Sequence, residues 1–245
     1  MRAAGRLVGE VLTALKPKVV PGVTTAELDE IAEQLIADAG ATPAFKGYHG
    51  YPATICASIN EEVIHGIPSG QRVLQEGDIL SIDVGASLEG YFGDSAITLP
   101  VGKVSEEAAT LLRVTEEALY KAIECARPGG RVSDIGHAVQ QHVEAHGFSV
   151  VREFVGHGIG QRMHEEPQVP NYGEAGRGPR LAEGMVLAIE PMVNAGKPAV
   201  KVLSDGWTAV TRDKSLSAHF EHTVAVTAGG AWILTAREVP VAARR

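Results

Sequence analysis

The sequence predicts an α/β fold of two similar halves that pack side by side, with strands inside and helices outside. A repeated segment supports this prediction, because residues 74–83 (LQEGDILSID) return as residues 181–190 (LAEGMVLAIE) at an offset of 107 residues. The upstream helices repeat at the same offset, and no Ser/Pro-rich linker separates the copies. We therefore expect one domain over residues 1–245, built from an internal repeat of about 1–104 and 105–245.

Composition narrows the class of protein before any motif is considered. The chain has 245 residues, of which 44% are hydrophobic and 21% are charged, an ordinary balance for a globular protein. Its formal net charge of −8 argues against nucleic acid as a direct partner, and no apolar run is long enough to span a membrane. Two cysteines, Cys56 and Cys125, do not suggest a disulfide framework, so the cytoplasm is the simplest compartment.

The N-terminal segment, residues 1–18, is predicted to be an amphipathic helix of the mature protein. Its apolar residues Val8, Val11 and Leu12 recur at helical spacing. Glu10 interrupts the stretch where a signal peptide would be uniformly apolar, and no small-residue cleavage site follows. We therefore expect this segment to belong to the folded domain.

Each half then contains a second amphipathic helix, predicted at residues 26–38 and at residues 133–145. Each helix has a short polar start signal and a glycine stop signal. These signals are Thr25 and Gly40 in the first half, and Ser133 and Gly147 in the second. A series of turns, helices and strands in register over some sixty residues indicates duplication rather than chance.

The repeated strand is predicted to end in a carboxylate in both copies, in Asp83 and in Glu190. A further carboxylate follows each, since Asp94 lies 11 residues after Asp83 and Glu221 lies 31 residues after Glu190. A buried carboxylate is costly unless it is paired or bound to metal. A salt bridge or an exposed strand end would explain any one of them, whereas four at symmetric positions favour a divalent metal site.

The second half carries about twenty extra residues between its two carboxylates, and this insertion contains Trp207. Surface loops absorb insertions at little entropic cost, because the cost of loop closure grows slowly with length. Long loops are often functional. We therefore expect the insertion to be a surface loop.

The residues around each histidine indicate whether it has a binding role or a structural one. His157 lies in GHGIG, where the glycines allow a ligand close to the backbone, and this favours a metal ligand. His65 and His164 are predicted to contact substrate rather than metal. His142 and His146 share one face of a helix, and without a nearby third ligand we interpret them as a solvated helix surface.

These residues together resemble the Asp-Asp-His-Glu-Glu metal site of the pita-bread metallopeptidases. The matching positions are Asp83, Asp94, His157, Glu190 and Glu221. Further motifs narrow the resemblance to type I methionine aminopeptidases, and it covers nearly the whole chain. They are GYHGYP from Gly47, CASINEEVIHGIP from Cys56, GHGIG from Gly156, IEPM from Ile189 and FEHT from Phe220.

The resemblance implies a pita-bread fold with an inner antiparallel sheet and outer helices. It implies removal of the N-terminal methionine from nascent proteins and peptides whose second residue is small. Two divalent ions (Co, Mn, Fe or Zn) would share Asp83 and Glu221, with Asp94 completing one site and His157 with Glu190 the other. The substrate's free α-amine would bind a metal directly, which restricts cleavage to the first residue.

The same resemblance implies roles for three residues in the reaction. Glu190 would carry the proton from water to the leaving amine. His164 would hold the developing oxyanion or the scissile amide. His65 would contact the scissile nitrogen or the intermediate.

The family positions also imply an apolar pocket for the unbranched thioether chain of methionine. Its lining on this chain is Phe45, Tyr48, His49, Tyr51, Cys56, Met163 and Trp207. Phe45 occupies a position that is often Cys, and Met163 one that is often Phe, but both remain apolar. One methylene changes binding by only about 1–3 kcal/mol, so norleucine-like side chains stay open as substrates.

Two alternatives stay open at this point. An aminopeptidase P or prolidase-like peptidase shares the fold, but usually carries an N-terminal domain that this chain is too short to hold. A non-enzymatic peptide-binding protein could also use the fold, although such relatives typically lose metal ligands. We expect a monomer that acts on nascent peptides without a membrane partner, whereas ribosome contact and a monovalent cation near Glu61, Glu62 and Ser217 stay open.

Overall fold

The computed structural model describes residues 1–237, so residues 238–245 of the predicted domain lie outside the described part. The helices are α1 (Arg2–Leu15), η1 (Lys16–Lys18), α2 (Thr25–Asp38), η2 (Tyr48–Gly50), α3 (Glu106–Glu124) and α4 (Val132–Ala145). The strands of the first half are β1 (Thr42–Pro43), β2 (Ile55–Ile59), β3 (Glu62–Ile64), β4 (Ile79–Leu88) and β5 (Tyr91–Pro100). Those of the second half are β6 (Ser149–Val150), β7 (Gly156–Gly158), β8 (Glu165–Val169), β9 (Val186–Ile189), β10 (Met192–Asn194), β11 (Val200–Val202), β12 (Ala209–Thr211), β13 (Ser217–His219), β14 (His222–Thr227) and β15 (Gly230–Ile233).

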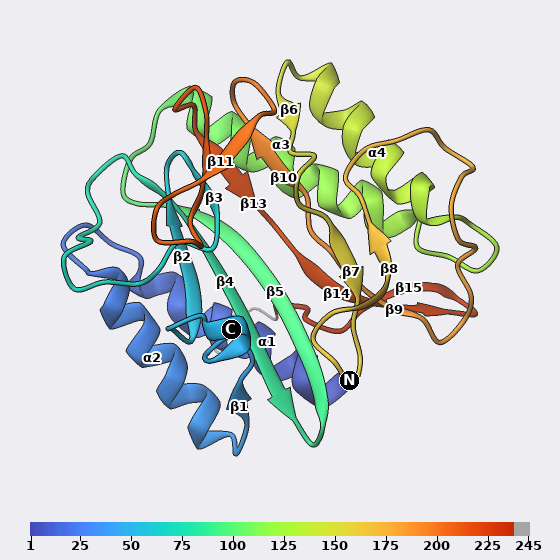
Figure 1. Cartoon of the computed structure of the whole chain (residues 1–245), viewed down its shortest axis with the longest axis horizontal. Helices are drawn as coiled ribbons and strands as arrows, with labels where there is room; N and C mark the ends of the chain where they lie inside the picture. Colours follow the sequence, from blue (N-terminus) through green and yellow to red (C-terminus); the bar gives the residue numbers. More distant parts are fainter. Residues whose placement is uncertain (238–245) are drawn as a thin grey trace, which may run out of the picture.

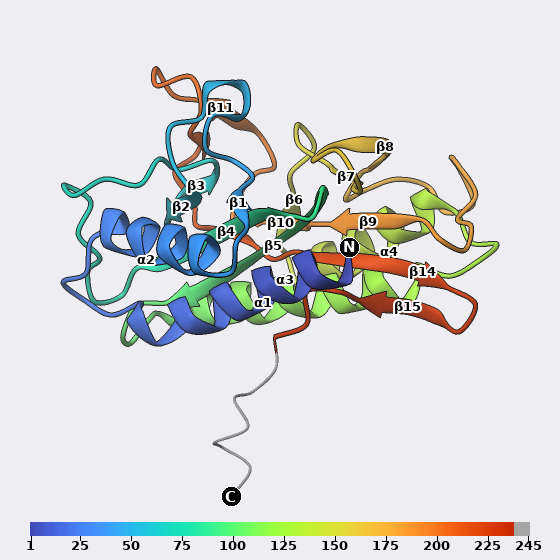
Figure 2. The same cartoon turned by 90° about the horizontal axis from the view of Figure 1, so that it is seen from below.

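Antiparallel strands form the inner layer, and β4 and β9 occupy equivalent places in the two halves (Figure 1). β4 pairs with β1, β2 and β5, while β9 lies between β7 and β14. Two smaller sheets have the strand orders β13-β10-β6 and β11-β12-β3. Figure 2 shows α1 and α3 on one side of this inner layer, and the segments with β3, β8 and β11 on the other.

The two copies of the repeat fold into the same local structure. The helices α2 and α4 begin and end 107 residues apart, and so do the first residues of β4 and β9. Gly22 and Gly129 both have positive φ, +92° and +85°, and their N–H groups donate to the carbonyls of Leu74 and Leu181 (2.8 and 2.9 Å). Each half therefore ties the turn before its second helix to the segment that leads into its inner strand.

The predicted start signals of these helices are wrong, by one position in α2 and by two positions in α4. α2 begins after Thr24, whose hydroxyl accepts from the Glu27 N–H (3.2 Å) while the Glu27 carboxylate accepts from the Thr24 N–H (2.7 Å). This reciprocal capping satisfies two N–H groups at the helix end. Thr25 instead exchanges hydrogen bonds with the Ser69 backbone. In the second half Arg131 takes the cap position rather than Ser133.

One continuous apolar cluster runs through both halves, between the helices and the inner strands. Leu28 and Ile36 of α2 are fully buried, as are Ile135, Val139 and Val143 of α4. Truncating such a side chain to alanine costs about 2–5 kcal/mol, so these helices hold the inner strands firmly. Among residues 1–237, no helix is long and apolar enough to cross a membrane.

Candidate active site

The first two carboxylates lie on the hairpin of β4 and β5. The predicted strand end at Asp83 is wrong, because β4 continues through Leu88 before the chain turns into β5. The turn at residues 89–90 has positive φ at both positions (52° and 78°), the backbone that two-residue hairpin turns favour. Since Asp94 pairs with Gly85, two residues after Asp83, both aspartates lie on one face of the hairpin.

The other two carboxylates lie across from each other, just beyond the paired parts of β9 and β14. His222 pairs with Ile189 in this antiparallel ladder, so the next position places Glu221 opposite Glu190. On the other edge of β9, His157 of β7 is opposite the residue two positions before Glu190. Because residues two apart on a strand share a face, His157 and Glu190 lie on the same side of the sheet.

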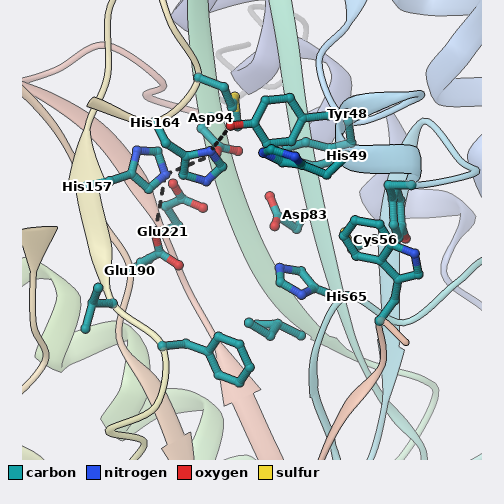
Figure 3. Close-up of a pocket in the computed structure, with 17 residues that line it drawn as sticks. Tyr48, His49, Cys56, His65, Asp83, Asp94, His157, His164, Glu190 and Glu221 are labelled. Carbon is teal, nitrogen blue, oxygen red and sulfur yellow. Dashed lines mark hydrogen bonds and ion pairs between the residues drawn. The ribbon is translucent and has the colours of Figure 1, made fainter. Parts of the chain in front are cut away.

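Hydrogen bonds join the two halves at this place. The Ser95 hydroxyl donates to the Glu221 carbonyl (2.6 Å), and the Glu221 N–H donates to the Ala96 carbonyl (2.9 Å). The Thr223 hydroxyl donates to the Asp94 carbonyl (2.7 Å) and accepts from the Asp94 N–H (3.0 Å). These bonds hold β5 beside β14, and the carboxylates of the two halves meet at the seam (Figure 3).

The four carboxylates and His157 lie close together and are largely buried. The Nε2 atom of His157 lies 3.8 Å from Asp94 Oδ2 and 3.7 Å from Glu190 Oε1. Asp94, His157 and Glu221 each place a ligand atom within 4.8 Å of the other two. One buried oxygen each of Asp83, Asp94 and Glu221 has no hydrogen-bond partner among the described residues. An unpartnered buried oxygen is costly, and a bound cation would satisfy it.

The electrostatics of the cluster also favour a bound cation. Burial raises the pKa of Asp83 to about 7. Burial first, and then the neighbouring carboxylates, raise the pKa values of Asp94, Glu190 and Glu221 well above their ordinary range. Four carboxylates in one dry site cannot all ionise without a compensating charge. Hard oxygen ligands with one imidazole suit a divalent transition-metal ion, so the donor set fits a metal.

The ring of His157 is oriented as a metal ligand would be. Its Nδ1–H donates to the Gly158 carbonyl (2.9 Å), which leaves Nε2 as the acceptor that faces the carboxylates. Burial, and then the neighbouring His164, lower the pKa of His157 to about 4. The imidazole is therefore neutral at pH 7, which is the form that binds metal.

His219 is a residue of this cluster that the sequence analysis missed. Its Nε2 atom is buried, has no hydrogen-bond partner among the described residues, and lies 3.7 Å from Glu190 Oε2. With Glu190 and Glu221 it forms a second group of three close ligand atoms. The available signal was its place two residues before Glu221, because alternate residues of an extended chain share a face.

One cavity of about 270 Å³ contains the carboxylates and every predicted site residue. Figure 3 shows His65, His157, His164 and the four carboxylates around one space. The predicted pocket residues Phe45, Tyr48, His49, Tyr51, Cys56, Met163 and Trp207 also line it. Ile64, Phe154 and Val155 complete the lining, and the sequence analysis had no signal for them.

The insertion of the second half supplies part of this apolar wall. Its strands β11 and β12 form a hairpin, and β12 pairs with β3 of the first half. The Asp205 carboxylate accepts from the Trp207 and Thr208 N–H groups (2.8 and 2.9 Å), which fixes the turn between the two strands. The Trp207 ring then packs edge-on against Tyr51 (5.1 Å) and His65 (6.2 Å).

Two further histidines face the cavity beside the carboxylates. The Tyr48 hydroxyl is hydrogen-bonded to His164 Nδ1 (2.8 Å), and the His164 ring lies 4.2 Å from that of His157. His65 has a positive φ of 61°, and its ring packs against Phe154 (5.9 Å). Burial lowers the pKa of His164, and burial followed by the charge of His164 lowers that of His65 to about 4.

Comparison with known proteins identifies the family. A model of metallopeptidase family M24 matches residues 1–228. The chain belongs to metallopeptidase family M24. The methionine aminopeptidase of Clostridium acetobutylicum is 58% identical over 96% of this chain and 94% of its own length. That of Escherichia coli K12 is 49% identical over 97% of this chain and 90% of its own.

Solved structures give the same result for the fold. The crystal structure of methionine aminopeptidase from Thermotoga maritima has a TM-score of 0.95 and 48% identity, over 96% of this chain and 94% of that one. A prolidase from Pyrococcus furiosus has a TM-score of 0.75 and 25% identity, over 97% of this chain but 63% of that one. The predicted pita-bread fold and the resemblance to methionine aminopeptidases are confirmed.

Proposed function

We propose that this protein removes the N-terminal methionine from nascent proteins and peptides with a small second residue, in a metal-dependent hydrolysis. The observation that carries the proposal is the single cavity in which an apolar wall meets a carboxylate cluster. The wall offers an apolar surface for a side chain, and the cluster offers the ligands of a hydrolytic metal centre. The relatives named methionine aminopeptidases support the same reaction.

Two divalent ions, Co, Mn, Fe or Zn, are the cofactors that the ligand set favours. Asp83 and Glu221 would be shared between them, with Asp94 in one site and His157 and Glu190 in the other. When bound, such ions anchor the substrate's α-amine, polarise its carbonyl and lower the pKa of water. A monovalent cation near Glu61, Glu62 and Ser217 stays part of the proposal, and Glu62 already pairs with Arg72 there.

Glu190 is proposed to move the proton. Its carboxylate closes the cavity beside His157, and burial raises its pKa, so it can accept a proton from water and release it to the leaving amine. A carboxylate in a polar aqueous setting would hold that proton too weakly for the second transfer. This role requires one oxygen of Glu190 to face the substrate while the other faces the ligand cluster.

His164 is proposed to hold the carbonyl oxygen as negative charge develops on it. Burial lowers the pKa of His164, so its ring is neutral and carries one proton. With the Tyr48 hydroxyl donating to Nδ1, that proton lies on Nε2 and can be donated to the oxyanion. His65, held between Phe154 and Trp207, would contact the scissile nitrogen from the other side of the cavity.

Specificity is proposed to come from the wall formed by Phe45, Tyr48, His49, Tyr51, Cys56, Met163 and Trp207. Phe45, Tyr51, Cys56 and Met163 belong to one buried apolar cluster, which Tyr48 and Trp207 border. Such a wall accepts an unbranched apolar side chain and excludes a charged one. Phe45 packs over Gly85, where a Cβ would lie 2.5 Å from the ring, so the strand itself leaves room for this wall.

The remaining features of the proposal concern the protein as a whole. We propose one catalytic domain, built from a repeat of about 1–104 and 105–245, that acts as a monomer in the cytoplasm. Its partners would be the N-termini of nascent peptides, with ribosome contact open and no direct role for nucleic acid. The shared apolar cluster and the hydrogen-bonded seam support a single domain.

Peptide hydrolysis by metal-stripped protein, resupplied with Mn²⁺ or Co²⁺, tests the proposal. Met-Ala-Ser, Ala-Ala-Ser and Met-Pro-Ala are compared side by side. We expect metal-dependent release of methionine from Met-Ala-Ser, with Ala-Ala-Ser untouched. Cleavage that ignores the first residue and requires proline second would replace the proposal with a prolidase-like activity. Folded protein that cleaves no peptide with any metal would indicate a binding protein.

A further inference from the structure

Another group of side chains that could bind a metal lies on the outer helices, away from the cavity. It consists of Glu117 on α3 and of His142 and His146 on α4, and none of the three lines the cavity. The two helices lie side by side (Figure 1). The premise that no third ligand lies near His142 and His146 is therefore wrong, because packing of α3 against α4 brings Glu117 beside them.

The three side chains already converge on one point. Glu117 Oε2 and His142 Nε2 are 3.0 Å apart, and the two imidazole rings are 4.6 Å apart. Each residue places a ligand atom within 4.8 Å of the other two. A tetrahedral zinc ion with bonds of about 2.1 Å holds its ligands roughly 3.4 Å apart. Closing the group around an ion therefore needs a shift of at most about 1.4 Å, which rotation of surface side chains allows.

The orientation of the rings favours a metal rather than a plain surface. His146 Nδ1–H donates to the His142 carbonyl (2.8 Å), so Nε2 is the acceptor atom of that ring. Metal-bound histidines are commonly held in this way, with the other nitrogen donating to a carbonyl. His142 is a neutral imidazole at pH 7, because burial lowers its pKa, and moving its proton to Nδ1 makes Nε2 a ligand.

The charges around the group are mixed but compatible with a cation. Arg113 pairs with Glu117 Oε1 (2.9 Å), which leaves Oε2 facing His142. The hydrogen bond from Arg113 first, and then that from His142, keep the pKa of Glu117 below its ordinary value, so this carboxylate is ionised. Lys121 also contributes positive charge near His142. Arg113 is about half exposed and can move towards solvent when a cation binds.

We propose that Glu117, His142 and His146 form a binding site for a divalent cation of the zinc class, separate from the peptidase centre. Two imidazoles and one carboxylate suit Zn²⁺, Ni²⁺ or Cu²⁺ rather than Mg²⁺ or Ca²⁺, which prefer oxygen ligands. Three protein ligands leave the fourth tetrahedral position to water. The ion links α3 to α4, so its binding stabilises the folded chain by mass action.

Zinc binding by the full chain tests this site without using activity as the readout. Metal-stripped wild-type protein and His146→Gln protein are dialysed against buffered free Zn²⁺, and bound zinc per chain is measured. His137→Gln is the matched control, because His137 also lies on α4 and bonds to the Gly173 carbonyl outside the group. His146 is exposed, so its replacement should leave the fold intact, which thermal denaturation without metal verifies.

We expect wild-type and His137→Gln proteins to bind one zinc ion per chain more than His146→Gln protein does. Crystals soaked in Zn²⁺ should show an anomalous peak between α3 and α4 in the wild type. Equal zinc content in the wild type and His146→Gln, or no peak at these helices, overturns the site. Methionine release should be the same in all three proteins. Since zinc content is the readout, failure of the peptidase proposal would not alter the result.

Discussion

The two halves of the molecule share a scaffold but differ in how they carry their carboxylates. In the first half, one two-residue turn joins β4 to β5, and Asp83 and Asp94 lie inside a continuous hairpin. In the second half, Glu190 follows β9 and Glu221 precedes β14, and the chain between them contains β10 to β13. Equivalent strands thus present four carboxylates at one seam. Only the second half carries an insertion, and this insertion reaches the cavity wall.

This difference separates the repeated elements from the insertion in the second half. The repeated elements fix where the ligands meet, because hydrogen bonds from Ser95 and Thr223 join β5 to β14. The insertion places Trp207 against Tyr51 and His65 of the first half, and so completes the pocket wall. Under the proposed function, the repeated elements would hold the metal site, and the insertion would add Trp207 to a pocket wall that comes mostly from the first half.

The largest effect should come from Glu190→Gln, which removes the proposed proton carrier from the second half. Proton transfer by a positioned side chain contributes about 10²–10⁴-fold to a rate, so methionine release from Met-Ala-Ser should fall by that factor. The measurement is kcat, with circular dichroism to show that the fold is retained. Glu183→Gln, at an exposed position before the same strand, is the control and should leave kcat unchanged. Activity at the wild-type level in Glu190→Gln would contradict the assignment.

A smaller effect should come from Trp207→Ala, which removes the wall supplied by the insertion and leaves the seam untouched. Loss of apolar pocket contacts is worth about 1–3 kcal/mol, so kcat/KM for Met-Ala-Ser should fall roughly 10–200-fold. Metal content should remain as in the wild type. Trp232→Ala, at a residue of β15 that is 47% exposed, is the matched control. A loss of bound metal in Trp207→Ala would show that the insertion also supports the metal site.

Tyr48→Phe should have a still smaller effect, because it removes one hydrogen bond to His164 and keeps the ring in the wall. A neutral hydrogen bond is worth about 0.5–1.5 kcal/mol, so kcat should fall roughly 2–12-fold while KM changes little. Tyr120→Phe, at an exposed tyrosine of α3, serves as the comparison. An effect on KM alone would place Tyr48 in substrate binding rather than in positioning His164.

The last prediction concerns stability rather than methionine release. The folded-state pKa of Asp83 is raised to about 7 from an ordinary value of 3.8, so between these values the folded chain holds a proton that the unfolded chain releases. Histidines whose pKa values are lowered by burial, such as His65 and His157, contribute the opposite change. The contribution of Asp83 to the metal-stripped protein is therefore a loss of stability as pH rises from about 4 to 7, complete above 7. Urea denaturation at pH 5 and pH 7.5 measures the difference. Asp83→Asn should reduce this slope, and an unchanged slope would contradict the cause.

The sequence alone predicted the repeated framework well, because local signals and register specify it. The offset of 107 residues located α2 with α4 and β4 with β9, and glycine stops at Gly40 and Gly147 have positive φ of +68° and +80°. The end of β4 was misplaced, because the turn signal at residues 89–90 was not used. The predicted site residues all line one cavity, but their catalytic and ligand roles stay predictions.

Other features depend on packing between distant segments, which a single sequence does not encode locally. Phe154 reaches the cavity from the loop before β7, where no motif indicates a pocket residue. Glu117 lies on α3, and its place beside His142 follows only from the crossing of two helices. His219 could be predicted only in part from the sequence. Its spacing from Glu221 indicates the same face of the strand, but its position beside Glu190 follows from the packing of the two halves.

We propose that both halves contribute ligands to one metal centre at the seam. Crystals of metal-stripped protein soaked in Mn²⁺, with anomalous diffraction recorded near the manganese edge, test it most directly. We expect two peaks in the cavity, each in contact with carboxylates from both halves, Asp83 or Asp94 on one side and Glu190 or Glu221 on the other. Manganese bound by residues of one half only, or no peak in the cavity of folded protein, would contradict it.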